Sequence, residues 1–333
     1  MFFMKFSDEK LYVGHIDQLF RVKTYNLLDG RAKGVKAVDI DSGSGLELTL
    51  IPDRCMDFFQ LKFKGKNLNY ITPNGVCGPQ YYDGGGNKWL YNTFLGFLTT
   101  CGLDNIGKPK DGCGLHGRIS NTPAENFSVR IFNDENDAPY VILSGTMKQA
   151  HIFGENLSLT RAVRINYREN TLYFTDTLEN CGYKNQEFKL MYHFNFGYPL
   201  LCEDTKIILP TQNIIARDGH AQAHMEDYLK ITPPSDEYTE MCYFHKLKKN
   251  ENGRSEYSVL NKKENIGVSV NYDSGLLDHF VQWKMFGSGE YVTGLEPCNA
   301  ALDGQSDKEP IQTKILKPQE KLEYNFIIKC FEA

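Results

Sequence analysis

Segments in which apolar and polar residues alternate recur along most of this chain. Residues 46–50 show the pattern clearly, because leucines at every second position are separated by Glu and Thr. Further segments are rich in β-branched and aromatic residues, and short polar breaks separate many of them; they lie at residues 58–63, 68–71, 141–147, 157–167, 172–178, 188–194, 266–272, 280–286 and 322–328. A period of two residues is that of a half-buried strand, so the sequence predicts a mainly β protein.

Only two segments show a helical pattern, at residues 88–98 and 221–228, and both are short. The polar residues 64–67, with a glycine among them, predict a hairpin between the second and third segments. The chain has no linker-like stretch, fixed-period repeat or block of like charge, so we expect residues 1–333 to form a single domain. Many short strands with few short helices favour a large antiparallel β-sandwich.

Composition excludes several classes of protein. Of 333 residues, 41% are hydrophobic, which excludes a disordered chain. The 37 Lys and Arg against 42 Asp and Glu give a formal charge of −5, so the chain has no broad basic field and nucleic acid is not an expected partner. We expect no membrane span, because no run approaches about 18 apolar residues.

The cysteines and the amino end indicate the compartment. The nine cysteines are odd in number, scattered and never spaced as Cys-x-x-Cys, which predicts free thiols in a reducing cytoplasm. The apolar residues 1–6 are followed at once by Ser, Asp, Glu and Lys, too early for the core of an export signal. We therefore expect a cytoplasmic protein, and its oligomeric state stays open.

Three segments carry residues suited to chemistry. Gly114-Leu115-His116-Gly117-Arg118 sets an imidazole and a guanidinium between glycines, which permit tight turns and close approach of a ligand. In the strand-like segment 191–199, alternation places His193 and Asn195 on one face and three aromatic residues on the other. Two polar groups on one face of an aromatic strand are costly to bury without partners.

The third segment is Gly294-Leu295-Glu296-Pro297-Cys298, in which a single carboxylate stands among uncharged residues. Desolvation raises the pKa of a carboxyl group and makes it a better general base near neutrality. For each of the three segments a structural role is the alternative: a hydrogen-bonded loop histidine, a core histidine or an ion-paired carboxylate.

The order of these motifs resembles the aldose 1-epimerases of the galactose mutarotase-like superfamily. The similarity is greatest to the DUF4432 branch, and extends over residues 20–330. It rests on Ile51-Pro52-Asp53-Arg54-Cys55-Met56-Asp57, on residues 114–124 and 192–199, on Gln282-Trp283-Lys284 and on Leu295-Glu296-Pro297.

The resemblance implies a mutarotase-type sandwich that binds a free monosaccharide and interconverts its α and β anomers without a cofactor or metal. It implies that Glu296 takes the proton of the anomeric hydroxyl while His193 protonates the ring oxygen. Substrate contacts are implied for His116, Trp283, Gln282 and Asn195. Such a reaction only moves protons between oxygens, so an acid and a base suffice.

The chain departs from the mutarotase motif Leu-His-Gly-Gly at one position. It has Arg118 after Leu115-His116-Gly117, which predicts a cation on the sugar-binding face, and Arg54 is a candidate for a second. Arginines in a sugar site hold neutral hydroxyls or select an acidic or phosphorylated sugar by bidentate contacts. The substrate-orienting Asp of mutarotases has no counterpart that can be matched from the sequence.

Three alternatives stay open. A zinc site would use His220, His224, Cys242 and His245, although the second pair falls where a strand is plausible. A glycosidase would need a second carboxylate opposite Glu296. A non-catalytic sugar-binding or sensing module would keep the fold without needing a matched acid and base.

Overall fold

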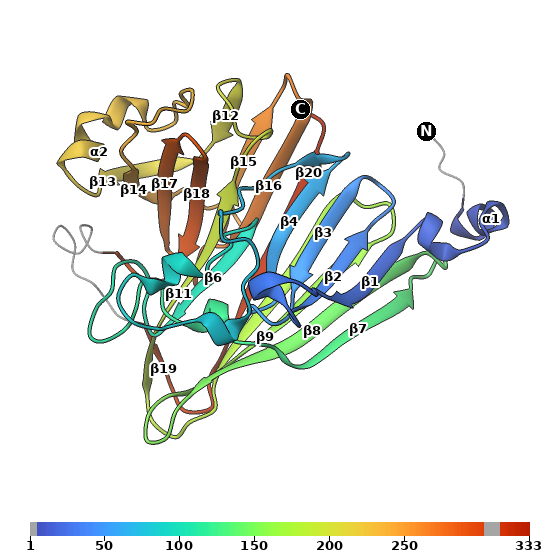
Figure 1. Ribbon diagram of the computed structural model, residues 1–333, viewed down its shortest axis with the longest axis horizontal. Coiled ribbons are helices and arrows are strands. Elements are labelled where there is room, and N and C mark those ends of the chain that lie inside the picture. Colours follow the sequence, from blue (N-terminus) through green and yellow to red (C-terminus); the bar gives the residue numbers. More distant parts are fainter. Residues whose placement is uncertain (1–4, 303–313) are drawn as a thin grey trace.

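The computed structural model describes residues 5–302 and 314–333, which form two large antiparallel sheets. The larger sheet has the strand order β1-β2-β3-β4-β6-β11-β18-β17-β14-β13, with β5 paired to β4 and β19 to β11. Figure 1 shows this sheet crossing the molecule from β1 to β13. Its strands are β1 (Arg21–Asn26), β2 (Lys36–Asp41), β3 (Leu46–Ile51), β4 (Asp57–Phe63), β5 (Lys66–Asn67), β6 (Leu98–Leu103), β11 (Gln186–Phe196), β13 (Thr211–Ala216), β14 (Met241–Leu247), β17 (His279–Gly287), β18 (Glu290–Cys298) and β19 (Lys314–Leu316).

The smaller sheet has the strand order β12-β15-β16-β20-β10-β9-β8-β7. Its strands are β7 (Glu125–Asn133), β8 (Pro139–Ala150), β9 (Asn156–Asn166), β10 (Thr171–Asn180), β12 (Thr205–Ile208), β15 (Arg254–Asn261), β16 (Ile266–Asp273) and β20 (Lys321–Phe331). The expected mainly β antiparallel sandwich is thus confirmed.

Helices are few and short in the described residues. The α-helices are α1 (Phe6–Glu9) and α2 (Gly219–Ala223), and single 3-10 turns lie at Lys10–Tyr12, Ile16–Gln18, Gly30–Ala32, Pro79–Tyr81, Lys88–Tyr91, Ile119–Asn121 and Met225–Asp227. None of these helices has the length and apolar character needed to cross a membrane.

The main core lies between the two sheets. On β11, Tyr192, Phe194 and Phe196 point into it, as the alternation predicts, and they are fully buried. Phe194 packs against Phe326 of β20 with ring centroids 5.8 Å apart. The intervening His193 therefore faces the opposite side of the larger sheet.

A buried ion cluster joins the two sheets. Arg161 of β9 donates to Asp176 of β10 through Nε (2.8 Å) and Nη2 (2.7 Å), and to Asp57 of β4 through Nη1 (2.9 Å). Thr100 of β6 and Tyr192 of β11 donate to the same carboxylates, Thr100 to Asp57 and Tyr192 to Asp176. Hydrogen bonds thus satisfy charges that would be very costly to bury alone.

Three local predictions differ from the structure. Residues 88–98 form no α-helix: the 3-10 helix Lys88–Tyr91 is followed by an irregular segment and then by β6. Trp89 and Phe94 in this segment are buried, so the apolar residues that imitate a helical face anchor a loop instead. The expected strand at 68–71 makes only isolated bridges, and the helix expected at 221–228 ends at Ala223.

Candidate active site

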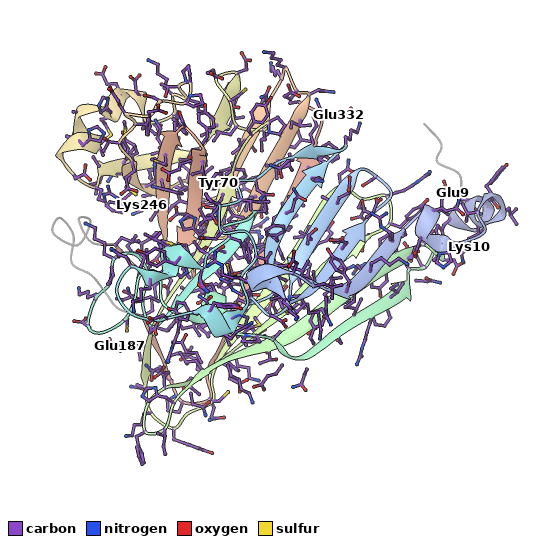
Figure 2. The ribbon with its side chains drawn as sticks, in the orientation of Figure 1. Glu9, Lys10, Tyr70, Glu187, Lys246 and Glu332 are labelled. Carbon is purple, nitrogen blue, oxygen red and sulfur yellow. The ribbon has the colours of Figure 1, made fainter. Side chains whose placement is uncertain are left out.

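A cavity of about 650 Å³ lies on the outer face of the larger sheet. Its floor crosses β11, β18, β17 and β14, and the loops before and after β6 supply its walls. Tyr70, labelled in Figure 2, lies at its side and donates its hydroxyl hydrogen to the carbonyl oxygen of Gly289 (3.0 Å). The volume is in the range of small-molecule sites.

His193 and Glu296 meet at the floor of this cavity. The register of β11 and β18 pairs Met191 with Cys298 and Phe194 with Leu295, which places His193 opposite Glu296. The distance from His193 Nε2 to Glu296 Oε1 is 3.2 Å. The side chains are only 5% and 2% exposed, so little water is available to solvate a charge on either group.

Burial changes the pKa of both groups in opposite directions. Desolvation raises the pKa of Glu296 well above its usual value, and the negative charge of Glu240 adds to this. Desolvation lowers the pKa of His193 well below its usual value, assisted by the nearby His116 and opposed by the side chain of Asn195. Burial therefore favours the neutral forms of both groups, a protonated carboxyl and a neutral imidazole.

His116 lies beside this pair, with its ring centroid 5.4 Å from that of His193 and 4.7 Å from that of Trp89. Burial lowers its pKa to about 4, against the opposite effect of Glu240. Its Nδ1 accepts a hydrogen bond from the backbone N–H of Gly107 (3.3 Å), so the neutral ring carries its hydrogen on Nε2. His116 is thus a hydrogen-bond donor in the cavity wall.

Trp283 supplies an aromatic side to the cavity, and its ring centroid lies 5.8 Å from that of His193. Its Nε1 donates to Glu240 Oε2 (2.9 Å), and Arg217 Nη1 contacts Glu240 Oε1 at 2.9 Å. Both Arg217 and Glu240 line the cavity. A carboxylate, a guanidinium and an indole therefore form one polar cluster beside the His193–Glu296 pair.

Four of the residues predicted to contact substrate lie outside the cavity lining. Arg54 is buried and donates to the backbone carbonyls of Ser120, Cys77 and Asn92. Gln282 points to the inner side of β17.

There Gln282 contacts His245 Nε2 through Oε1 (3.1 Å) and donates to the carbonyl of Tyr228. Asn195 is buried behind His193 and donates to the carbonyl oxygen of that residue (2.8 Å). The fourth, Arg118, lines a separate cavity of about 470 Å³. These four side chains hold protein groups in place.

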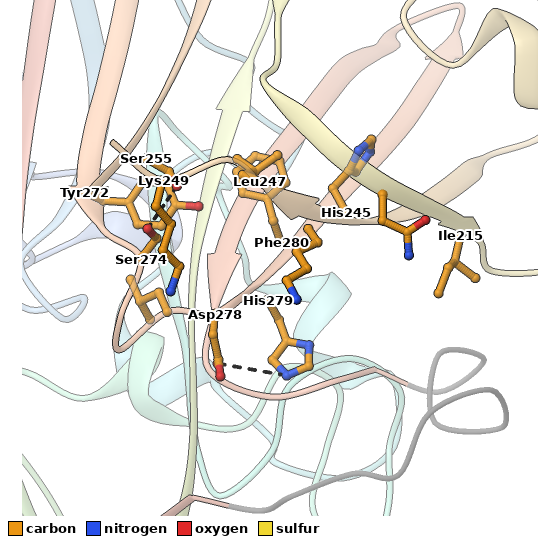
Figure 3. A pocket seen from close by; sticks show the side chains of 13 residues that line it. Ile215, His245, Leu247, Lys249, Ser255, Tyr272, Ser274, Asp278, His279 and Phe280 are labelled. Carbon is orange, nitrogen blue, oxygen red and sulfur yellow. Dashed lines mark hydrogen bonds and ion pairs between the residues drawn. The ribbon is translucent and has the colours of Figure 1, made fainter. Parts of the chain in front are cut away.

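A third cavity, of about 370 Å³, lies between β14, β17 and the β15–β16 hairpin (Figure 3). Its polar groups are occupied with one another or with neighbours: Ser255 donates to Ser274, Asp278 pairs with Lys314, and His245 contacts Thr211. It contains one histidine–carboxylate pair, with His279 Nε2 3.9 Å from Asp278 Oδ1, but these side chains are 26% and 40% exposed. Because His193 and Glu296 are closer together and far better buried, the cavity on the outer face is the better candidate for an active site.

The residues of the possible zinc site are not brought together. His220 and His224 pack edge to face at α2, with ring centroids 5.0 Å apart. Cys242 lines the main cavity, whereas His245 lies on the other face of β14. Within residues 5–302 and 314–333, no group of three or more His, Cys, Asp or Glu side chains is arranged to hold a metal ion.

Comparison with known proteins identifies the family of the chain. The sequence model described as a domain of unknown function, DUF4432, matches residues 32–330. The chain belongs to the DUF4432 family. Among curated proteins, none matches the sequence.

Solved structures share the fold of this DUF4432 protein. A Klebsiella pneumoniae protein whose assignment as an aldose 1-epimerase is provisional is 24% identical, with a TM-score of 0.88 over 96% of this chain and 86% of that one. A galactose mutarotase-like protein from Clostridium acetobutylicum is 14% identical, with a TM-score of 0.66 over 95% and 100%. Galactose 1-epimerase from Lactobacillus acidophilus is 12% identical, with a TM-score of 0.61 over 94% and 99%. The fold is therefore that of the galactose mutarotase-like proteins.

Sequence reasoning missed Arg217, Glu240 and Trp89 in the cavity of this DUF4432 protein. Arg217 and Glu240 stand at the two ends of the segment between β13 and β14, and neither lies within a strand. The pairing of β13 with β14 brings the two ends of that segment together. The one sequence signal for these two cavity residues is a charged residue next to each strand, Arg217 directly after β13 and Glu240 directly before β14.

Proposed function

We propose that this protein interconverts the α and β anomers of a free, neutral monosaccharide, as an aldose 1-epimerase does. The observation that carries the proposal is the buried His193–Glu296 pair, with 3.2 Å between Nε2 and Oε1, at the floor of a cavity large enough for a sugar. Oε1 of Glu296 faces Nε2 of His193 without a well-aligned hydrogen bond and has no other hydrogen-bond partner among the described residues, which leaves it available to a sugar hydroxyl.

The reaction needs one group that accepts a proton and one that donates it. One member of the pair takes the proton of the anomeric hydroxyl, and the other protonates the ring oxygen. The bond from C1 to the ring oxygen breaks as the C1 carbonyl forms. Rotation about the C1–C2 bond and closure on the other face of the carbonyl give the second anomer, and the protons return.

We assign these roles to Glu296 and His193. Resemblance to mutarotases implies a Glu296 carboxylate as base and a His193 imidazolium as acid, whereas burial favours the neutral pair in the empty cavity. The two forms differ by transfer of one proton across the contact between Nε2 and Oε1. Each form contains one group that can donate a proton and one that can accept a proton, so either form can supply the acid and the base that ring opening requires.

The other cavity residues suit recognition of a sugar. His116 donates from Nε2 to a sugar oxygen, and the face of Trp283 packs against the C–H surface of the ring. Glu240 accepts hydrogen bonds from hydroxyl groups and takes the place of the substrate-orienting Asp of mutarotases.

The charges in the cavity favour a neutral sugar over an acidic one. Arg217 is already paired with two carboxylates, those of Asp218 and Glu240. Glu290 adds a further negative charge to the lining. Lys108 is the second cation of the lining, so Lys108 and Arg217 only balance Glu240 and Glu290. Because Arg54 and Arg118 lie elsewhere, no excess positive charge remains to attract an anionic sugar.

The experiment is anomer exchange by saturation-transfer NMR over neutral aldoses, uronic acids and sugar phosphates. We expect exchange on at least one neutral aldose. Glu296→Gln and His193→Asn should each lower the rate about 100-fold or more, since each removes one proton transfer. Glu256→Gln, an exposed change on β15, is the matched control.

Two outcomes would overturn the proposal. If the wild type binds a sugar without exchanging its anomers, the protein is a sugar-binding or sensing module on the same fold. If Glu296→Gln and His193→Asn keep the full exchange rate, the pair is not the catalytic site. Circular dichroism of each variant separates lost chemistry from lost folding.

A further inference from the structure

Arg118 follows the turn that carries His116, but its guanidinium points into a charged cluster outside the main cavity. Its Nη2 donates to Oε1 of Glu155, and its Nε lies 3.2 Å from Oδ2 of Asp104. The second carboxylate oxygen of Glu155 contacts Nδ1 of His151. Glu155 and Asp104 are 12% and 22% exposed and Arg118 is 41% exposed, so the carboxylates of this cluster are better shielded from water than those of ordinary surface ion pairs.

The cluster connects segments that are distant in the sequence. Asp104 follows the last residue of β6, and Glu155 precedes the first residue of β9. Arg118 therefore ties the β6–β7 connection, in which His116 lies, to the turn between β8 and β9. β6 belongs to the larger sheet and β9 to the smaller one, so this ion cluster links the two sheets.

The backbone at His116 requires such support. Its φ is +57°, in the left-handed region that non-glycine residues rarely adopt, and the surrounding contacts must maintain that conformation. Gly102 holds the turn from both sides: its N–H donates to the carbonyl of His116 (3.0 Å), and its carbonyl accepts from the N–H of Arg118 (3.0 Å).

A chain of contacts runs from Arg118 to the rest of this turn. Asp104 binds Arg118 through Oδ2 and accepts the N–H of Asn105 through Oδ1 (2.8 Å). The side-chain nitrogen Nδ2 of Asn105 donates to the backbone carbonyls of Gly114 (3.0 Å) and Lys108 (2.8 Å). Each contact fixes the next part of the loop, and the loop fixes the imidazole of His116 against Gly107.

We infer that Arg118 is a positioning residue that holds His116 in place for the sugar and does not itself contact the substrate. This inference rests on the proposed function for its effect on turnover. It replaces both expectations for this position, contact with neutral hydroxyls and selection of an acidic sugar, because Arg118 lines the cavity of Tyr82, Cys113 and His151 instead of the main cavity.

The test compares Arg118→Met, Arg118→Lys and Glu155→Gln, with Lys148→Met as the control. Lys148 forms an exposed ion pair with Glu125 and lies on β8, next to the same turn. Displacement of His116 by about 1 Å is expected to lower kcat/KM for a neutral aldose about 10- to 100-fold in Arg118→Met. Glu155→Gln should act in the same direction, and Arg118→Lys should restore part of the rate, because an ammonium cannot hold two carboxylates with the guanidinium geometry.

A spectroscopic measurement tests the position of His116 without turnover. With ¹⁵N-labelled histidine, the eight imidazoles give a resolvable spectrum, and His116→Gln assigns the signal of interest. We expect the His116 signal to shift or broaden in Arg118→Met and Glu155→Gln and to stay unchanged in Lys148→Met.

Two results would overturn the inference. Loss of turnover confined to anionic sugars would show that Arg118 contacts the substrate. A lower melting temperature with an unchanged His116 signal would show a merely structural role. If the wild type exchanges no sugar, the proposed function fails, and the His116 spectrum alone then decides the role of Arg118.

Discussion

Gly294 of β18 lies directly beside Glu296, and a Cβ atom added at Gly294 would be 2.2 Å from Oε1 of that carboxylate. It would also be 3.0 Å from Cε1 of His193. Both distances are shorter than carbon can approach these atoms without displacing them. Because Gly294 and Glu296 share a face of the strand, the missing side chain provides the space in which the His193–Glu296 contact forms.

Substitution of Gly294 by Ala should therefore disable the site without removing a polar group. The added methyl group separates Glu296 from His193, and we expect the anomer exchange rate to fall about 100-fold. Gly219→Ala is the matched control, since a Cβ there meets nothing within 4 Å. Exchange that survives in Gly294→Ala at the wild-type rate would rule out a requirement for direct contact between the pair.

The pH profile of exchange should be broad. Groups with ordinary pKa values of about 4.3 and 6.5, acting as carboxylate and imidazolium, would give a bell that declines above about pH 6.5. Here burial raises the pKa of Glu296 and lowers that of His193, so the pair keeps one proton across the interval between them. We expect a rate that changes little on either side of about pH 6.5, the ordinary pKa of histidine. A rate that falls in proportion to imidazolium above pH 6.5 would contradict the coupled pair.

The buried ion cluster should contribute strongly to stability. Arg161→Met leaves Asp57 and Asp176 without their shared cation, which should lower the free energy of unfolding by about 3–5 kcal/mol. Arg164→Met, on an exposed position of the same strand, should cost less than about 1 kcal/mol. Urea unfolding of both variants gives the comparison, and equal losses would show that the cluster adds nothing beyond a surface contact.

Lys284 should make stability increase with pH. Burial lowers its pKa to about 8, although its Nζ donates to the carbonyl of Asp227 (2.8 Å). Between about pH 8 and 10.4 the unfolded chain still binds the proton that the folded chain has released, so stability rises with pH. The wild type should gain up to about 3 kcal/mol over Lys284→Met across this interval. Urea unfolding at several pH values measures this difference in the free energy of unfolding, and the exposed Lys246→Met is the control. A difference between wild type and Lys284→Met that does not change with pH would show that burial does not lower the pKa of Lys284.

The alternation of residues along β11 allowed the direction of His193 to be predicted from sequence. Strand geometry fixes which face a residue takes, and the aromatic residues on either side of His193 leave no doubt about the buried face. Glu296 follows the same rule on β18. Register then brings the two together, but register depends on strand pairing across about 100 residues of sequence and is not readable from either segment alone.

Long side chains and loops were predicted less well, for physical reasons. Arg54, Arg118 and Gln282 stand in motifs next to the site, yet the direction of a flexible side chain depends on which carbonyls and carboxylates its neighbours present. Glu240 escaped notice because the segment before β14 has no periodic pattern. The helix expected at 88–98 failed because its apolar residues are buried by tertiary contacts instead of along one helical face.

Intrinsic fluorescence should report sugar binding, because the chain has two tryptophans and both line the main cavity. Trp89 is buried against His116 and donates a hydrogen bond from Nε1 to Ser120 Oγ. Trp283 is partly exposed in the cavity lining, where a ligand can contact it. A bound sugar that packs on Trp283 removes water from the indole and changes its emission, so titration with the exchanged aldose should give a saturable signal. Trp283→Phe should remove most of that signal and weaken binding about 10-fold, a loss typical of one well-placed aromatic contact. Trp89→Phe should keep most of the signal. If instead the response survives Trp283→Phe and disappears in Trp89→Phe, the sugar lies on the loop side of the cavity, and the assignment of Trp283 as its aromatic platform is wrong.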